Sequence, residues 1–401
     1  MLNNFSRRIE GKNAELKKQI IGLCVNDGAH SIAELSRKVG ASVPTVTKLV
    51  FELIDASLLI DMGKQSTSGG RRPSIFGLSA NAGYFLGVDV RRESVCIAVT
   101  DFKGDIIVYS DDIPFLLEST EASFNALCDL IKLTIHENDL EFDKILGCGI
   151  NFTGRVNKKT GYCFAYDLGP DRPLETVLEE HLNLPVTIEN DSRAMTYGEY
   201  LYGPASENVK DMIFLNVSWG LGMGLILRRK LHYGKSGYSG EFGHFPMLQN
   251  NVICQCGKTG CLETGASGLA LYRMVLERLA AGRVSSLSPK YQNGERITLD
   301  DILAAIRDED VLAIECIEEV GTNLGRGLAG IINLFNPETV IIGGRLEAAG
   351  DYLMLPIRSA VNKFSLSLVN KDTPIEFSKM GSKAGPLGAC MLSRSKTLGL
   401  I

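Results

Sequence analysis

The part of the chain after Tyr84 alternates strand-like and helical patterns, and this alternation limits the fold more than any other feature. A helical pattern at 119–136 separates two groups of short apolar runs. The runs are YFLGVDV, SVCIAVTD, DIIVYSDDI and KILGCGI, followed later by DMIFLNVSWG, GLGMGLILRR and TVIIGGRL. Strands that alternate with helices are typical of an α/β fold. The second round of strands predicts two similar lobes with a cleft between them.

Three helices are predicted before this body begins. Apolar residues recur at helical spacing from Ala14 to Val25, which predicts the first helix. Ser31 and Glu34 have the spacing of a capping box and predict a short second helix, which Gly40 closes. Ser42 then predicts the N-cap of a third helix. The pattern is that of a helix, a tight turn and a helix.

The third helix has one apolar face and one polar face. Thr45, Thr47 and Lys48 lie on the polar face near the N-terminal end. A recognition helix meets base edges in the major groove with this end. We therefore expect these three side chains to read DNA.

A strand-like pair follows the third helix and predicts a wing. Apolar runs at 58–60 and 75–78 flank the polar loop GKQSTSGGRRPS. Arg71 and Arg72 lie beside two glycines in this loop, and we expect them to reach phosphates or a narrow minor groove. The alternative is a three-helix packing module with a charged loop.

Charge and apolar content fit this division of the chain. Residues 1–80 carry 11 Lys and Arg against 7 Asp and Glu, a net charge of +4, and the remainder carries 31 against 40, a net charge of -9. The basic excess permits nucleic-acid contact without proving it, since it is also typical of a solvated surface. Neither a signal peptide nor an apolar run of about 18 residues is present, so we expect a cytoplasmic protein.

Four metal-ligand side chains lie within eighteen residues of one another. They are His244, Cys254, Cys256 and Cys261 in GHFPMLQNNVICQCGKTGCLE. Three thiolates and one imidazole make a closed tetrahedral zinc shell, so we expect structural zinc. Buried or redox-active cysteines are the alternative, which the nearby histidine disfavours. The other seven cysteines are scattered singly, as reduced core residues are.

Carboxylates and amides suited to sugar hydroxyls gather in the middle of the chain. Asn190 and Asp191 follow the strand-like LPVTIE, while Glu241 and Glu263 flank the cysteine cluster. The carboxyl end of a strand is where α/β sheets bind ligands. For Asn190 and Asp191 the alternative is an Asx turn or an N-cap.

Glycines also follow the strand-like runs of the body. Such glycines let backbone N–H groups approach a phosphate or a sugar. Alone, each of them is weak evidence for a binding site. They are Gly220, Gly222, Gly224 and the pair Gly343-Gly344.

Taken together, these motifs resemble the ROK family of repressors and sugar kinases. VSWGLGMGL, Gly234 and GEFGH match the family's signature, and the cysteine cluster follows at the expected spacing. SGGRRPS and the helices before it are similar to the repressor branch, which includes xylose and N-acetylglucosamine repressors. The resemblance covers nearly the whole chain. It implies a two-lobed actin-like or hexokinase-like sugar-kinase fold, a duplicated ribonuclease H-like unit, behind a winged helix-turn-helix.

The resemblance also assigns roles to particular residues. It implies that the sugar contacts are Gly154, Asn190, Asp191, Glu241, His244 and Glu263. In the family's kinases the Asp191 position is the general base, since a carboxylate can take a proton from a sugar hydroxyl. His244 could bind zinc through one ring nitrogen and sugar through the other.

One segment departs from the kinase pattern. The family's enzymes carry Asp-x-Gly-Gly-Thr after the first strand, whereas this chain reads Asp89-Val90-Arg91-Arg92-Glu93. Bulky side chains replace the glycines that cradle phosphate, and Glu93 places negative charge there. We therefore expect no ATP use. The two arginines would either attract an anionic ligand or stay solvated.

The predicted organisation is a winged helix-turn-helix at 1–80, a first lobe at 81–195 and a second lobe with the zinc cluster at 196–401. The leading hypothesis is a repressor of carbohydrate genes, in which a homodimer or homotetramer holds operator DNA. A sugar or sugar phosphate in the kinase-like cleft would change its DNA affinity. The alternative is an ATP-dependent sugar kinase with an accessory DNA-binding domain, supported by Asp191 and by Gly343-Gly344.

Overall fold

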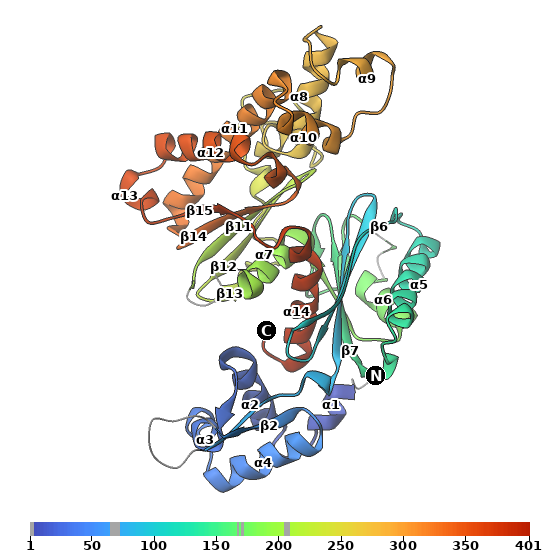
Figure 1. Cartoon of the computed structure of the whole chain (residues 1–401), viewed down its shortest axis with the longest axis vertical. Helices are drawn as coiled ribbons and strands as arrows, with labels where there is room; N and C mark the ends of the chain where they lie inside the picture. Colours follow the sequence, from blue (N-terminus) through green and yellow to red (C-terminus); the bar gives the residue numbers. More distant parts are fainter. Residues whose placement is uncertain (1–3, 65–72, 167, 170–171, 204–208) are drawn as a thin grey trace. The chain divides into compact units, whose positions relative to one another are not determined.

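The chain is described here by a computed structural model that covers residues 4–64, 73–166, 168–169, 172–203 and 209–401. It consists of two compact units, coloured along the sequence in Figure 1. The first unit holds Met1–Ala194 and Gly385–Ile401, and the second holds Met195–Ala384. The sequence keeps 385–401 with the second lobe, whereas the contacts of this segment lie in the first unit.

The N-terminal helices and a small sheet form what we call the head. Its helices are α1 (Asn4–Ile9), α2 (Ala14–Asp27), α3 (Ile32–Val39) and α4 (Val43–Asp55). Its strands are β1 (His30–Ser31), β2 (Leu59–Lys64) and β3 (Ser74–Leu78), in the antiparallel order β1-β3-β2. Helices α2, α3 and α4 and strands β2 and β3 confirm the sequence prediction. Helix α1 and strand β1 were not predicted.

Capping residues decide where the head's middle helices begin and end. The Ser31 side chain accepts a hydrogen bond from the Glu34 backbone, and Glu34 Oε2 accepts one from the Ser31 backbone at 2.8 Å. Gly40 ends α3 in the left-handed conformation, with φ at 67°. Ser42 caps α4, whose apolar face is buried in the head. The predicted capping box and turn are therefore confirmed.

The first lobe is built on a mixed five-stranded sheet in the order β10-β7-β4-β5-β6. Its strands are β4 (Tyr84–Val90), β5 (Ser94–Asp101), β6 (Ile106–Pro114), β7 (Ile145–Phe152) and β10 (Val186–Asn190). β7 runs parallel to β4 and β10, whereas β5 runs antiparallel to β4 and β6. Short elements are η1 (Ala80–Ala82), η2 (Phe142–Lys144), β8 (Val156–Asn157) and β9 (Tyr162–Cys163). The helices are α5 (Glu121–Glu137), α6 (Leu174–Leu182) and α14 (Ala384–Leu398).

Glycines in two central strands let α14 lie directly on this sheet. A Cβ atom at Gly149 in β7 would lie 2.1 Å from the Ala389 carbonyl oxygen of α14. A Cβ atom at Gly87 in β4 would lie 1.9 Å from the Pro386 carbonyl oxygen. Any larger residue at either position would push the helix away from the sheet. Packing against α14 therefore explains these two glycines.

The second unit repeats the same plan. Its sheet has the order β13-β12-β11-β14-β15, with β11 (Met212–Val217), β12 (Leu221–Leu227), β13 (Lys230–Leu231), β14 (Thr339–Gly343) and β15 (Ile375–Phe377). The first strand again pairs antiparallel with the second and parallel with the fourth. Numbered in chain order, both sheets read 3-2-1-4-5. The predicted α/β body of two similar lobes is confirmed.

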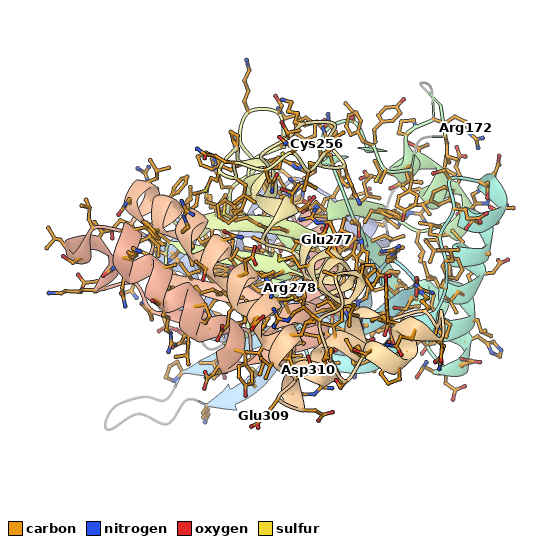
Figure 2. All side chains as sticks on the ribbon, turned by 90° about the horizontal axis from the view of Figure 1, so that it is seen from above. Arg172, Cys256, Glu277, Arg278, Glu309 and Asp310 are labelled. Carbon is orange, nitrogen blue, oxygen red and sulfur yellow. The ribbon has the colours of Figure 1, made fainter. Side chains whose placement is uncertain are left out.

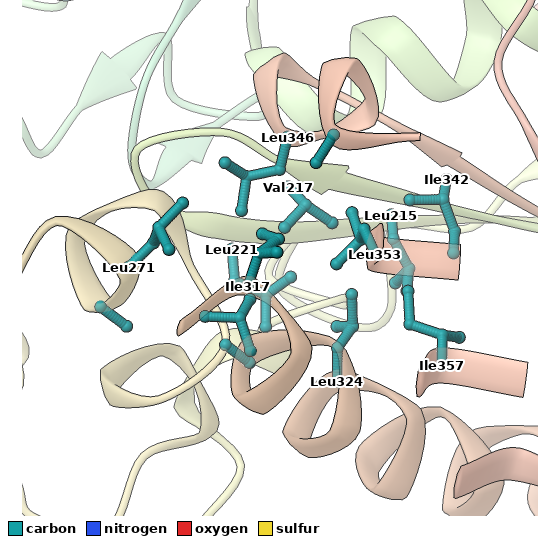
Figure 3. Packing of buried hydrophobic residues seen from close by; sticks show 14 of the residues in the cluster. Leu215, Val217, Leu221, Leu271, Ile317, Leu324, Ile342, Leu346, Leu353 and Ile357 are labelled. Atoms are coloured by element: carbon teal, nitrogen blue, oxygen red, sulfur yellow. The ribbon is translucent and has the colours of Figure 1, made fainter. Parts of the chain in front are cut away.

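Helices cover the second sheet and complete its core. They are α7 (Asp191–Tyr202), which begins in the first unit, and α8 (Gly268–Ala280), α9 (Ser288–Gln292), α10 (Leu299–Arg307), α11 (Val311–Phe335), α12 (Asp351–Phe364) and α13 (Ser367–Asn370). The 3-10 turns are η3 (Phe242–His244), η4 (Leu262–Thr264), η5 (Arg345–Ala349) and η6 (Gly381–Lys383). Leu215 and Ile342 of the sheet pack against Leu324 of α11 and Ile357 of α12 (Figure 3). Among the described residues, none of these helices is both long and apolar enough to cross a membrane.

Candidate functional site

The polar face of α4 carries the three predicted DNA contacts. The Lys48 side chain is 75% exposed, and its Nζ lies 3.9 Å from Glu52 Oε1, one helical turn away. Thr45 Oγ1 lies 2.8 Å from Ser42 Oγ, and Thr47 Oγ1 donates to the Val43 carbonyl at 2.8 Å. Lys48 is therefore the cation of this face, while both threonine hydroxyls make local bonds.

The two predicted wing arginines cannot be placed. Arg71 and Arg72 lie in 65–72, outside the described residues. The strands on either side of this segment are described, and β2 and β3 pair from Leu59 with Leu78 to Lys64 with Ser74. The loop that carries the arginines therefore starts and ends at an antiparallel pair of strands.

Asn190 and Asp191 lie where β10 ends and α7 begins, as the sequence predicts. Asn190 Nδ2 donates to the Gly154 carbonyl at 2.9 Å and to Asp191 Oδ1 at 2.8 Å. The structure therefore brings three predicted sugar contacts together in the first unit. Asn190 Oδ1 also accepts from the Arg193 backbone at 3.1 Å, so the alternative role as an N-cap is present as well.

The Asp191 carboxyl lies in an environment that opposes its charge. Burial and the negative charge of Asp89 raise its pKa to about 6. The backbone N–H of Ser192 donates to Asp191 Oδ1 at 2.7 Å and partly offsets this effect. A carboxyl that titrates near neutral pH is typical of a functional position in an α/β fold.

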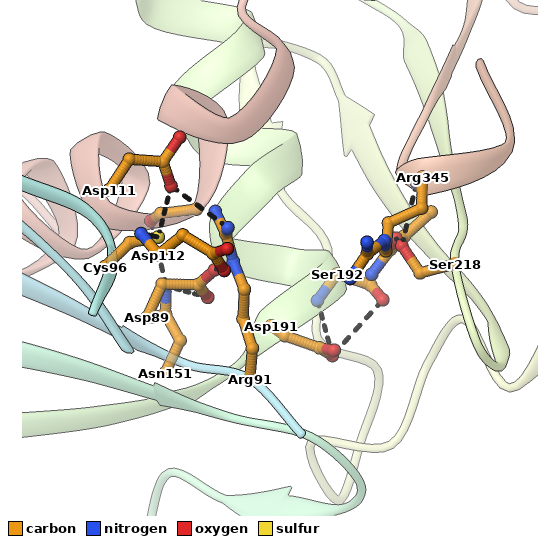
Figure 4. A network of polar contacts seen from close by, with 12 residues as sticks. Asp89, Arg91, Cys96, Asp111, Asp112, Asn151, Asp191, Ser192, Ser218 and Arg345 are labelled. Atoms are coloured by element: carbon orange, nitrogen blue, oxygen red, sulfur yellow. Dashed lines mark hydrogen bonds and ion pairs between the residues drawn. The ribbon is translucent and has the colours of Figure 1, made fainter. Parts of the chain in front are cut away.

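Residues at the carboxyl end of β4 form an ion-pair network (Figure 4). Arg91 Nε lies 3.1 Å from Asp89 Oδ2, and Arg91 Nη1 lies 3.1 Å from Asp111 Oδ1 on β6. Cys96 Sγ donates to the same Asp111 oxygen at 2.6 Å. Asn151 Nδ2 approaches Asp89 Oδ1 at 3.5 Å. Arg91 therefore has neither of its two expected roles, attraction of an anionic ligand or exposure to solvent. Two carboxylates of its own lobe neutralise its charge.

In the second unit Glu263 bridges the glycine-rich strand turn and the cysteine loop. Its Oε2 accepts from the Leu221 backbone at 2.9 Å, and Cys254 Sγ lies 3.7 Å from its Oε1. A Cβ atom at Gly220 would lie 3.0 Å from Glu263 Oε2, so glycine leaves room for the carboxylate. Gly224 instead faces Thr196 of α7, where an added Cβ would meet the hydroxyl at 2.0 Å. The two glycines therefore serve different purposes.

The predicted metal ligands are brought together in one cluster. The ligand atoms of His244, Cys254, Cys256 and Cys261 all lie within 4.8 Å of one another. Cys256 Sγ lies 3.6 Å from Cys261 Sγ, and Cys254 Sγ lies 3.5 Å from His244 Nδ1. Tetrahedral zinc with bonds of about 2.3 Å to sulfur separates its sulfurs by about 3.8 Å. The four side chains therefore fit a tetrahedral metal ion (Cys256 is labelled in Figure 2).

Local turns hold the cluster's loop in shape. The Cys254 backbone N–H donates to the Lys258 carbonyl at 2.8 Å, and Gly257 adopts a φ of 83° inside this turn. His244 presents Nδ1 to the cysteines, while its Nε2 lies 3.6 Å from Glu241 Oε2. The second ring nitrogen is therefore directed away from the thiols, toward the carboxylate side.

Two polar residues at the carboxyl end of β11 were missed by sequence reasoning. Ser218 Oγ donates to Asn216 Oδ1 at 2.7 Å and accepts from the Arg345 backbone at 3.2 Å (Figure 4). A Cβ atom at Gly344 would lie 2.7 Å from both of these side chains. The signal was available, because both residues follow the buried run MIFL in a parallel pair of strands.

Comparisons with known proteins bear on both parts of the chain. A family model described as the ROK family matches residues 85–396. The xylose repressor of Caldicellulosiruptor bescii is 31% identical over 396 residues, which is 96% of this chain and 98% of the relative.

Two solved structures show the same architecture. The crystal structure of a ROK family transcriptional regulator, a homologue of the Escherichia coli Mlc protein, superimposes with a TM-score of 0.79 at 27% identity. It covers 99% of this chain and 98% of its own. The ROK family glucokinase of Streptomyces griseus, solved with glucose and AMPPNP, has a TM-score of 0.67 at 28% identity and covers 78% and 100%.

Proposed function

Because the chain belongs to the ROK family, we propose that it is a transcriptional repressor of carbohydrate genes that a sugar or sugar phosphate releases from operator DNA. One observation carries the proposal. The repressor relative spans 96% of this chain, whereas the glucokinase structure spans 78% and the family model begins at residue 85. The head lies before residue 85. The similarity to a repressor includes this part of the chain, whereas the similarity to a kinase does not.

The head supports DNA contact through α4, which we take as the recognition helix of a winged helix-turn-helix. Lys48 offers an exposed cation, and Thr45 and Thr47 lie on the same polar face of the helix. Arg71 and Arg72 remain predicted contacts from the wing. A helix-turn-helix reads two half-sites as a symmetric pair, so we propose a homodimer or homotetramer in the cytoplasm.

Sugar recognition is assigned to six residues of the body. In the first unit they are Gly154, Asn190 and Asp191, and in the second Glu241, His244 and Glu263. Carboxylate and amide groups of this kind accept and donate hydrogen bonds to neighbouring hydroxyls. The mutual hydrogen bonds of Gly154, Asn190 and Asp191 support the first set. The close approach of Glu263 to the cysteine loop and to Leu221 supports the second.

Structural zinc is proposed for the cluster of His244, Cys254, Cys256 and Cys261. The donor set and its spacing support zinc over harder metals, because thiolates prefer soft cations. Four protein ligands leave no open coordination position, so the ion would hold the loop in shape rather than act on a substrate. His244 would be oriented by the metal through Nδ1 and would keep Nε2 for a sugar hydroxyl.

We further propose that the body has lost kinase activity. The Arg91 side chain pairs with Asp89 and Asp111, so the segment after β4 satisfies its own charges. Glu93 adds a negative charge. The run from Asp89 to Glu93 contains no glycine that would let backbone N–H groups approach a phosphate. The alternative of an ATP-dependent sugar kinase keeps Asp191 as its base, but it lacks this phosphate loop.

A binding experiment and an assay separate the two functions. The wild-type protein is used to select duplexes from a random-sequence DNA pool, and a coupled assay follows ATP consumption with magnesium and common hexoses. The repressor proposal predicts a shared sequence in the selected pool and no turnover. Turnover of about one per second or faster would identify a kinase, and a pool without a shared sequence would contradict the repressor.

A further inference from the structure

The short helix α1 attaches the head to the first lobe. Phe5 is fully buried, and its ring centroid lies 6.1 Å from that of Phe102, the residue that follows β5. Phe102 in turn stacks on Phe85 of β4 at 6.2 Å. Ile9 is also buried, at 2% exposed. One turn of helix therefore reaches the sheet that carries Asp89 and Asn190.

Arg8 lies between these two apolar anchors and binds both parts at once. Its Nε and Nη2 donate to the Ala56 carbonyl at 3.1 and 2.6 Å, and its Nη1 donates to the Ala82 carbonyl at 2.5 Å. Ala56 is the C-cap of α4, and Ala82 is the last residue of η1, just before β4. A single guanidinium therefore joins the end of the recognition helix to the start of the first lobe's central strand.

The chemistry of this contact favours arginine specifically. The guanidinium is planar and presents its N–H groups in a rigid fork, so bonds to two carbonyls fix the angle between the segments that carry them. The carbonyl end of a helix bears partial negative charge, which attracts the cation. A lysine would supply the charge as a single point and could not hold both carbonyls in this geometry.

The contact between Arg8 and Ala82 is connected through paired strands to the residues proposed to bind sugar. β4 runs from Tyr84 to Val90 beside β7, and β7 pairs with β10, which ends at Asn190. These strands are joined by continuous hydrogen-bonded registers from Val88 to Ile188 by way of Ile150. A hydrogen-bonded sheet is a rigid secondary element of the kind that carries coupling between distant sites. The recognition helix is thus tied to the same rigid sheet as Asn190 and Asp191.

We propose that Arg8 is a positioning residue that sets the direction of the recognition helix relative to the first lobe and so couples sugar binding to DNA affinity. The proposal rests on the repressor function and deepens it. Leu400 also holds α2 to the same unit, since a Cβ atom at Gly22 would lie 2.9 Å from Leu400 Cδ2. Arg8 contacts α4 directly, at its C-cap.

The test compares Arg8→Ala and Arg8→Lys with the control Arg7→Ala, which removes the same charge from an exposed position on the same helix. Hydrogen exchange is followed at the backbone amides of 52–58 and 80–86 in the full-length protein. Affinity for a duplex selected by the wild-type protein is then measured with and without a sugar. The panel holds D-xylose, N-acetylglucosamine and glucose, together with xylose 5-phosphate and the 6-phosphates of the other two sugars.

The positioning role predicts faster exchange in both segments for Arg8→Ala and no change for Arg7→Ala. It also predicts that the effective sugar weakens DNA binding by the wild type by about tenfold. The same sugar should weaken DNA binding by Arg8→Ala by less than about threefold. Sugar affinity itself should stay within twofold, and Arg8→Lys should resemble Arg8→Ala. Unchanged exchange, or a wild-type sugar response in Arg8→Ala, would overturn the inference.

The two proposals can fail separately. If the wild-type protein selects no DNA sequence, the repressor function fails, and the exchange measurement alone then decides whether Arg8 positions α4. If the wild type binds and responds while Arg8→Ala does the same, only the positioning role fails. A drop in melting temperature with the sugar response intact would show that Arg8 stabilises the head without coupling it.

Discussion

Arg91 Nε lies 3.1 Å from Asp89 Oδ2, at the carboxyl end of β4. The Asp89 side chain is only 8% exposed, so it depends on Arg91 for its counter-charge. The pair therefore belongs to the packing of the first lobe.

Arg91→Ala should therefore destabilise the protein. Among the described residues, removing the guanidinium leaves this nearly buried carboxylate with the long contact from Asn151 alone, which costs about 1–3 kcal/mol of unfolding free energy. Urea denaturation at neutral pH measures the loss. The control is Arg155→Ala at an exposed position of the same lobe, which should cost less than about 0.5 kcal/mol. Equal losses in both variants would contradict the structural role of the pair.

Removing the proposed zinc should lower stability. A metal that binds the folded cluster and not the unfolded chain stabilises the folded state, so chelation should lower the melting temperature by about 5–10 °C. Cys256→Ser should melt at the lower temperature already and gain no further sensitivity to the chelator. Cys128→Ser changes a buried cysteine outside the cluster and should keep the sensitivity. A wild-type melting temperature that does not change on chelation would show that the cluster holds no stabilising metal.

Glu347 should make stability depend on pH. Burial and the nearby charge of Glu199 raise its pKa to about 7, and both residues have a buried carboxylate oxygen without a hydrogen-bond partner among the described residues. The folded state then binds a proton more tightly than the unfolded state, whose glutamate pKa is about 4.3. Stability contributed by this group is present below pH 4 and lost as pH rises through 7.

Glu347→Gln should remove the loss of stability that accompanies ionisation of this carboxyl. The variant should melt a few degrees above the wild type at pH 8 and at nearly the same temperature at pH 4.5. Glu376→Gln, at an exposed position, is the matched control and should show no such trend. A constant difference between Glu347→Gln and wild type across this range would contradict the raised pKa.

Lys48 should contribute to DNA affinity through charge. Lys48→Ala should weaken binding to all sequences alike and reduce the slope of log affinity against log salt by about one. Thr45→Ala, by contrast, should relax sequence preference with little change in the slope. The control Lys103→Ala removes an exposed lysine of the first lobe. An unchanged slope in Lys48→Ala would remove this residue from the phosphate contacts.

Local signals explain why parts of the fold could be predicted from sequence. The capping residues Ser31, Glu34 and Ser42 act within their own helices, so the boundaries of α3 and α4 follow from short-range chemistry. The metal cluster follows in the same way from the spacing of four ligands. Asn190 and Asp191 could be placed because a polar pair directly follows a buried strand.

Contacts between distant segments explain what could not be predicted. α14 packs on Gly87 and Gly149, more than two hundred residues away, and no local pattern indicates that the chain returns to the first unit. α1 is only six residues long, too short for a helical period to stand out. Arg91 was interpreted from its neighbours in sequence, whereas its second partner, Asp111, lies on another strand.

Sugar bound by the body is proposed to weaken the protein's affinity for DNA, and the variant Asp191→Asn tests this coupling. Affinity for the selected duplex is measured at fixed salt and pH 7.5 for wild type and variant across the sugar panel. We predict that one sugar weakens wild-type binding by about tenfold or more, while Asp191→Asn binds the DNA normally and no longer responds. DNA binding that no sugar alters in the wild type, or an unchanged response in Asp191→Asn, would contradict the account.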